Sequence, residues 1–216
     1  MAYRCVATSV AGFVQQLAVA YVTHGYWFYV TGQIPENKDS AVVDRKLIDR
    51  YGIDVSKWTR VRRKRRGLAN LQYLRYKRFF VLIATPGEHP FFGAEGKEIR
   101  DIRRTPIRFI NYSIGCRLGR NGGRYHASVR IQLEHYQELK AHFQASATNL
   151  TVEDLIRDIR LLPYEPYAPV RDQLQGLLRA VNGQRKLAGL PTVPSRAIYW
   201  LRKSIQAVHV PRLSAL

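Results

Sequence analysis

The chain has 216 residues, 46% of them hydrophobic, so it is long enough to bury a core in one larger domain or two small ones. It carries 35 Lys and Arg against 16 Asp and Glu, a formal net charge of +19 at pH 7, which predicts an acidic polymer as partner. Its two cysteines, Cys5 and Cys116, show no motif spacing, which excludes a disulfide framework and a structural zinc knuckle. We therefore expect a reducing, cytoplasmic location.

The N-terminal third predicts a helix, a strand and a second helix. A serine caps the first helix, over 9–25, and the aromatic and β-branched stretch 26–34 is typical of a strand. The second helix covers 39–50. Two adjacent glutamines interrupt the apolar stretch 5–22, so we expect a core helix there and neither a membrane span nor a signal peptide.

A short helix predicted to begin at Ser56 contains the densest charge, with six cations in the seven positions Arg60–Arg66. No acidic residue occurs from Val55 to Gly87. Because clustered cations repel one another, a polyanion is their natural partner, and we expect the cations of the middle third to converge in one trough for it. The alternatives are a solvated basic face and adhesion to anionic lipid. The expected contacts are Lys57, Trp58, Arg60, Arg62, Arg63, Lys64, Arg65, Arg66, Arg75, Lys77 and Arg78.

The middle of the chain predicts three strands. The apolar stretch 71–85 is expected to form one buried strand. Strands over 107–118 and 124–133 are expected to form a hairpin, because the four residues between Gly119 and Arg124 include residues that tolerate positive φ. A basic ribbon can enter a groove or stack unpaired bases, and the alternative is a solvent-facing arginine ladder. The hairpin contacts would be Arg117, Arg120, Arg124 and Arg130.

The rest of the chain is predicted to be helical, with helices over 133–145, from 151, over 170–187 and over 195–208. Together these elements predict an α+β fold: a roughly four-stranded antiparallel sheet with helices on one face, followed by a helical C-terminal region.

A proline-rich break near 163–169 predicts a domain boundary. The expected division is a basic α+β nucleic-acid-binding domain over 1–162 and a helical appendage packed on it over 163–216. The apolar faces around 174–181 and 198–205 are candidates for contact with protein subunits.

Tyr136 and Lys140 lie four residues apart on one face of the predicted helix after the hairpin. This spacing is similar to the nucleophile motif of the Rep and relaxase family, the HUH endonucleases. The resemblance implies a tyrosine that attacks a DNA phosphate and a Mg²⁺ or Mn²⁺ ion held by two histidines flanking one apolar residue. His126 supplies the first of these histidines, and Ser128 stands where the second would be.

The same helix places three further side chains, His135, Glu138 and His142, along one face, where they could chelate a divalent metal. The alternative is a solvated polar face. No glycine-rich phosphate-binding motif is present, so nucleotide hydrolysis is not expected, and no cofactor is expected unless the protein is an enzyme.

The sequence thus predicts an intracellular nucleic-acid-binding protein, with DNA or RNA as ligand, acting alone or within a nucleoprotein or ribonucleoprotein complex. The alternative is a metal-dependent nicking or strand-transfer enzyme of the Rep, relaxase or transposase kind, as mobile elements use. No membrane partner is expected.

Overall fold

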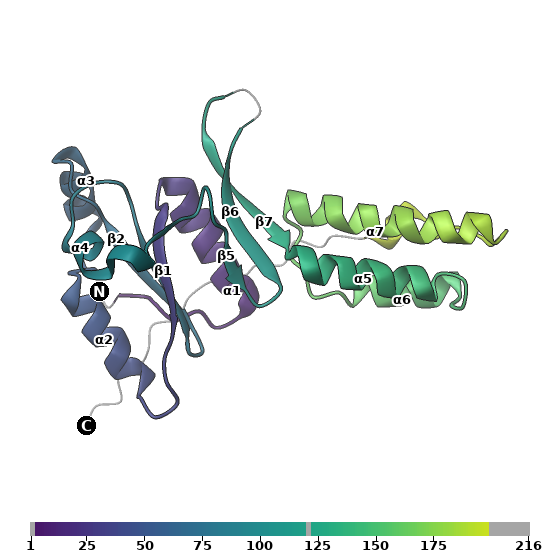
Figure 1. Ribbon diagram of the computed structural model, residues 1–216, viewed down its shortest axis with the longest axis horizontal. Coiled ribbons are helices and arrows are strands. Elements are labelled where there is room, and N and C mark those ends of the chain that lie inside the picture. The colour runs from purple at the N-terminus through teal and green to yellow at the C-terminus, as the bar shows by residue number, and fades with distance from the viewer. Residues whose placement is uncertain (1–2, 120–121, 199–216) are drawn as a thin grey trace. The chain divides into compact units, whose positions relative to one another are not determined.

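The structure, a computed structural model, describes residues 3–119 and 122–198 (Figure 1). These residues form two compact units. The sheet unit comprises 3–107 and the described residues of 114–127, and the helical unit comprises 108–113 and 128–198. These bounds differ from the expected ones, and the division into a basic domain over 1–162 and a helical appendage over 163–216 stays a prediction.

The first helix of the sheet unit begins as predicted. In α1 (Val10–Gln15) the Ser9 hydroxyl accepts a hydrogen bond from the Gly12 amide and caps the helix. The helix continues through a π-helical turn, Gln16–Tyr21, and a 3-10 turn, Val22–His24. It ends at Gly25, whose φ of 91° favours glycine.

The main sheet contains β1 (Phe28–Gln33), β2 (Leu71–Tyr76), β3 (Phe79–Ala84) and β4 (Arg100–Asp101) in the order β2-β3-β1-β4. All three neighbouring pairs are antiparallel. The α+β class and the four-stranded antiparallel sheet are therefore confirmed.

The stretch 71–85, expected to be one strand, is instead the hairpin of β2 and β3. Its turn is Lys77-Arg78, and Lys77 has a φ of 52°. Glycine and asparagine are the residues that usually mark such a turn, and neither occurs at this position. The sequence therefore carried no local signal for the reversal.

Helices cover both faces of this sheet, where the sequence predicted one (Figure 1). On one face the Phe13 ring of α1 meets Phe79, with ring centroids 5.8 Å apart. On the other face Tyr73 and Leu82 pack with Tyr51 of the segment after α2 (Ser40–Arg50) and with α4 (Pro90–Glu95). Both faces are apolar because successive strand residues point to opposite sides and most of them are hydrophobic.

The hairpin predicted after residue 107 is present, but it belongs to a second sheet. This sheet contains β5 (Ile107–Phe109), β6 (Tyr112–Leu118) and β7 (Tyr125–Ile131) in the order β5-β6-β7. The division between the two units falls within its strands.

The helical unit contains α5 (Leu133–Ser146), α6 (Val152–Arg160) and α7 (Ala168–Leu187), followed by a 3-10 turn at Ser195–Ala197. The face of α7 that the sequence offered to a protein partner is buried within this unit, through Leu174, Leu177, Leu178 and Val181. The expected helix over 195–208 and the face at 198–205 lie almost entirely outside the described residues. Within the described parts of the chain, no helix combines the length and apolar character that a bilayer crossing requires.

Candidate nucleic-acid interface

The cationic helix α3 (Lys57–Arg65) packs no side chain into the core. It begins as predicted, because the Ser56 hydroxyl accepts a hydrogen bond from the Thr59 amide. Trp58 is 75% exposed, although a tryptophan is ordinarily well buried. The helix therefore exposes most of its side chains to solvent.

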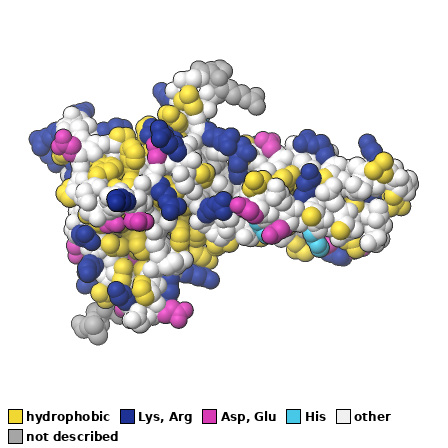
Figure 2. Space-filling model, viewed as in Figure 1, with side chains coloured by type: hydrophobic (Ala, Val, Ile, Leu, Met, Phe, Trp, Pro, Cys, Tyr) yellow, Lys and Arg dark blue, Asp and Glu magenta, His cyan; other side chains and the backbone are white. Residues whose placement is uncertain are grey.

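The cations of α3 and its C-cap remain without acidic partners. No ion pair involving Lys57, Lys64 or any arginine from Arg60 to Arg66 occurs among the described residues. Arg63 donates a hydrogen bond to the Gly52 carbonyl, 3.2 Å away, which ties the helix to the segment after α2. Lys and Arg side chains gather around this part of the surface (Figure 2). The charge here is available to a ligand.

The register of the main sheet brings a second basic segment to the end of the sheet that α3 adjoins. This segment follows β4 and includes Arg103 and Arg104. Leu71, Ala84, Phe28 and Asp101 lie in one row across β2, β3, β1 and β4. The loop from α3 enters the sheet at one side of this row, and the segment after β4 leaves it at the other. Neighbouring strands lie about 4.8 Å apart, so the row spans about 15 Å.

The second basic segment is organised around Arg103. Its guanidinium carbon lies 4.5 Å from the Trp27 ring centroid and 5.6 Å from that of Tyr125. Asp101 accepts hydrogen bonds from Arg103 Nε at 2.9 Å and Nη2 at 2.6 Å. These bonds lower the pKa of the Asp101 carboxyl. Arg103 thus forms a fixed aromatic–guanidinium platform at the edge of the sheet.

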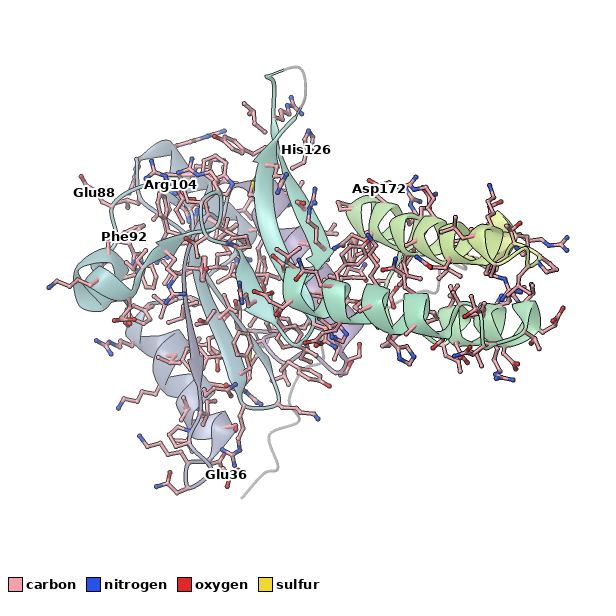
Figure 3. The ribbon with its side chains drawn as sticks, turned by 45° about the vertical axis from the view of Figure 1, so that its right-hand side comes forward. Glu36, Glu88, Phe92, Arg104, His126 and Asp172 are labelled. Carbon is pink, nitrogen blue, oxygen red and sulfur yellow. The ribbon has the colours of Figure 1, made fainter. Side chains whose placement is uncertain are left out.

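A groove of about 610 Å³ runs beside this platform. Tyr125 and the exposed cations Arg104 and Arg117 line it. Arg104 is labelled in Figure 3. Arg117 was expected to contact nucleic acid, whereas Trp27, Arg103 and Arg104 were missed. Trp27 and Arg103 are far apart in sequence, and no local pattern could have paired them.

The cations predicted at Arg75, Lys77 and Arg78 lie at the opposite end of the strands. Arg75 is four residues along β2 from Leu71, about 13 Å at about 3.3 Å per residue. Its Nε and Nη2 each lie 2.7 Å from a carboxylate oxygen of Asp44. The expected single trough is therefore not formed, since these residues are separated from α3.

Arg78 is also engaged internally. Its guanidinium donates hydrogen bonds to the backbone carbonyls of Pro35 and Glu36, which closes the loop between β1 and α2. Lys77 is exposed in the hairpin turn. The end of the sheet that carries these residues is called the turn end below, and the other is called the α3 end.

The remaining hairpin cations are divided between the units. Arg124 is exposed and belongs to the sheet unit, whereas Arg130 belongs to the helical unit, with its Nε 3.5 Å from the Ser128 hydroxyl. Arg120 lies outside the described residues.

The tyrosine offered as a nucleophile, Tyr136, packs against α7. A Cβ placed on Gly176 would lie 2.7 Å from the Tyr136 hydroxyl. Burial raises the pKa of this phenol, which makes the phenolate nucleophile harder to form. Tyr136 and Lys140 belong to the helical unit. His126, on β7, belongs to the sheet unit and is labelled in Figure 3. Their catalytic role stays a prediction.

The expected metal ligands come together only in part. The Nδ1 atom of His135 lies 3.4 Å from the Glu138 carboxylate, and the His142 ring meets Phe143 instead. Across residues 3–119 and 122–198, no group of three or more His, Cys, Asp or Glu side chains is arranged to hold a metal ion.

Comparison of this chain with protein-family models, with curated proteins and with solved structures finds no match. The function is therefore inferred from the residues of this chain. Their clearest arrangement is the pair of basic surfaces at the α3 end of the main sheet.

Proposed function

We propose that the protein binds nucleic acid through the α3 end of its main sheet. The observation that carries this proposal is the helix α3, whose cations have no acidic partner among the described residues. Lys and Arg beside a phosphate backbone release its condensed counterions, and this release favours binding. The ligand thereby offsets the repulsion among the clustered cations.

Exposed aromatic side chains support the same proposal. Trp58 lies on α3 among its cations, and Tyr125 lies beside Arg104 and Arg117 in the groove of the second basic segment. Base–aromatic stacking contributes about 1–3 kcal/mol per base and tolerates any sequence. We infer a ligand held through phosphates and unpaired bases, with DNA and RNA both suited to these contacts.

The proposal implies a reducing compartment that contains nucleic acid, such as the cytoplasm. Cys5 and Cys116 are both free and buried in the sheet unit. Burial raises the pKa of Cys5 to about 12, which keeps it an unreactive thiol.

The test removes Arg62, Arg63, Arg65 and Arg66 together by substitution to Ala. Binding of a labelled oligonucleotide is measured by fluorescence anisotropy at several salt concentrations. We expect the slope of log K against log salt to fall in magnitude by about 3, since each phosphate contact contributes about 0.7–0.9.

The matched control removes the same charge elsewhere, through Ala at four exposed residues: Lys38, Arg45, Lys46 and Lys77. This variant is expected to bind with nearly the slope and affinity of the unchanged protein. Equal losses in both variants would show that net charge alone attracts the ligand, and the proposed interface would be rejected. Unchanged binding in the α3 variant would reject it as well.

A further inference from the structure

A second, smaller groove lies against the inner face of α3, within the sheet unit. It encloses about 340 Å³. Lys57, Arg60 and Lys64 line it from the helix. These residues are three and four positions apart, so they share one face of α3. The opposite wall includes His24, in the 3-10 turn Val22–His24, and Tyr26, in the segment before β1. We call this cavity the α3 groove.

Three buried polar side chains, Asn70, Gln72 and Thr85, also line the α3 groove and form its floor. Gln72 is satisfied at both ends, because its amide donates to the Tyr26 hydroxyl at 3.2 Å and accepts from the Tyr3 hydroxyl at 2.7 Å. The Thr85 hydroxyl accepts a hydrogen bond from the Asn70 backbone amide at 2.9 Å. The floor is therefore held in place by its own bonds.

Asn70 is the exception, because its side-chain oxygen has no hydrogen-bond partner. The residue is only 4% exposed. Its Nδ2 donates to the Arg60 carbonyl at 3.0 Å, which fixes the orientation of the amide and leaves Oδ1 as the unused acceptor. An unsatisfied buried acceptor costs about 1–3 kcal/mol, and a hydrogen-bond donor that reaches Oδ1 from the groove removes this cost.

The α3 groove thus combines two demands on a ligand. The cations Lys57, Arg60 and Lys64 favour an anionic group on the ligand, and the Asn70 Oδ1 acceptor favours a neutral group that donates an N–H hydrogen bond. A nucleotide carries both groups, since its phosphate is anionic and an unpaired base has free amino or imino donors. In a duplex those donors on the pairing edge are already used. The volume lies near the lower limit of small-ligand pockets, about 300 Å³, so it suits one nucleotide and not a helix.

We propose that the α3 groove holds one unpaired nucleotide of a bound strand. The phosphate contacts Lys57, Arg60 and Lys64, and a base N–H donates to Asn70 Oδ1. This inference rests on the proposed function, because the nucleotide belongs to the nucleic acid that α3 attracts. It adds a preference for single strands over duplexes that free cations alone do not supply.

The first test compares two double variants of the same helix. Lys57→Ala/Lys64→Ala removes two charges that face the α3 groove, and Arg62→Ala/Arg66→Ala removes two exposed charges from the other side. Each variant is titrated with a single-stranded oligonucleotide and with a blunt duplex of the same sequence. We expect the groove variant to lose about tenfold in single-strand affinity and much less for the duplex. The other pair should weaken both ligands alike.

The second test removes bases and keeps phosphates. The unchanged protein is expected to bind a strand with abasic sites at least fivefold to tenfold more weakly than the intact strand, because one buried hydrogen bond and the base stacking are both lost. Asn70→Ala should reduce this difference, leaving only the share due to base stacking on Trp58 and Tyr125, while the salt slope is retained. Should Asn70→Ala fail to fold in thermal melts, the lysine variants decide the question.

The outcomes separate the two proposals. Absence of nucleic-acid binding in the unchanged protein rejects the proposed function and the α3 groove with it. If binding depends on the exposed arginines, but both double variants behave alike and Asn70→Ala leaves the loss caused by abasic sites unchanged, then only the inference about the α3 groove is overturned.

Discussion

The β2–β3 turn region and helix α3, at opposite ends of the main sheet, use similar cations in opposite ways. At the turn end, Arg75 is paired with Asp44 and Arg78 is bonded to backbone carbonyls. At the α3 end, the cations of Arg60–Arg66 form no ion pair among the described residues. A count of basic residues along the chain therefore overstates the surface that is available to a polyanion.

The difference has a physical cause in the local structure. Arg75 lies on a strand, on the face that packs toward Tyr73 and α2, so its charge is largely removed from water and needs a carboxylate. The cations of α3 lie on a helix with no buried residue, so water solvates them without a protein partner. Burial therefore explains why, among the residues that the structure describes, Arg75 forms an internal ion pair and the arginines of α3 do not.

The largest expected effect comes from breaking the pair at the turn end. The side chains of Arg75 and Asp44 are 12% and 6% exposed, and the Tyr73 hydroxyl also donates to Asp44. We expect Asp44→Ala to lower the free energy of unfolding by about 3–5 kcal/mol, because it leaves a buried charge unpaired. Urea denaturation measures this change. Asp49→Ala, at an exposed position of the same helix, should cost less than about 0.5 kcal/mol, and equal losses would refute the contrast.

The next effect concerns the attachment of α3 to the sheet. Gly87 has a φ of 131°, and a Cβ on it would lie 2.5 Å from the Gly67 carbonyl oxygen and 2.6 Å from the Ala69 amide nitrogen. We expect Gly87→Ala to destabilise the protein by about 2–3 kcal/mol and to weaken nucleic-acid binding, because the chain after α3 must shift. Thermal unfolding and anisotropy measure both effects.

The matched control for this prediction is Gly93→Ala in α4. A Cβ at Gly93 has nothing within 4 Å, so the substitution should be neutral or slightly stabilising. Similar melting temperatures for the two alanine variants would show that the close approach at Gly87 is not needed.

A smaller effect compares single cations at the two ends. Arg62→Ala should reduce the salt slope of nucleic-acid binding by about 0.7–0.9, the share of one phosphate contact. Lys77→Ala removes an equally exposed charge at the turn end and should leave the slope unchanged. A larger loss with Lys77→Ala than with Arg62→Ala would place the ligand at the wrong end for this proposal.

The smallest effect is a pH dependence of stability at the second basic segment. Hydrogen bonds from Arg103 lower the folded-state pKa of Asp101, so its contribution is fully present above the unfolded pKa of about 4. It is lost as the pH falls through the folded pKa. Asp101→Asn should be less stable than the unchanged protein at pH 6, and the gap should close toward pH 2 in urea titrations. A gap that is constant with pH would exclude this linkage.

The helix beginnings could be predicted from sequence because their causes are local. Ser9, Ser56 and Thr151 each cap the helix expected after them. In each case the side-chain hydroxyl accepts a hydrogen bond from the backbone amide three residues later. The hairpin within 71–85 could not be predicted, since Lys77 adopts its left-handed conformation without glycine or asparagine. The second sheet could not be predicted either, because strand periodicity does not say which strands pair.

The candidate site was predicted in its charge and not in its chemistry. The cations of α3 are visible in the sequence, whereas the Arg103 platform joins Trp27, Asp101 and Tyr125 from separate segments. The unused acceptor of Asn70 is also invisible in the sequence, because only the fold buries this residue in the wall of a cavity that Lys57 and Lys64 also line.

The sequence by itself determined the caps, the amphipathic helices, the exposed cationic helix and the α+β class, because each depends on residues a few positions apart. Tertiary structure alone decided which arginines are neutralised, where the aromatic platform lies and which buried acceptor is left unpaired. Those outcomes depend on contacts between residues far apart in the chain, and only the folded arrangement brings such residues within hydrogen-bonding distance.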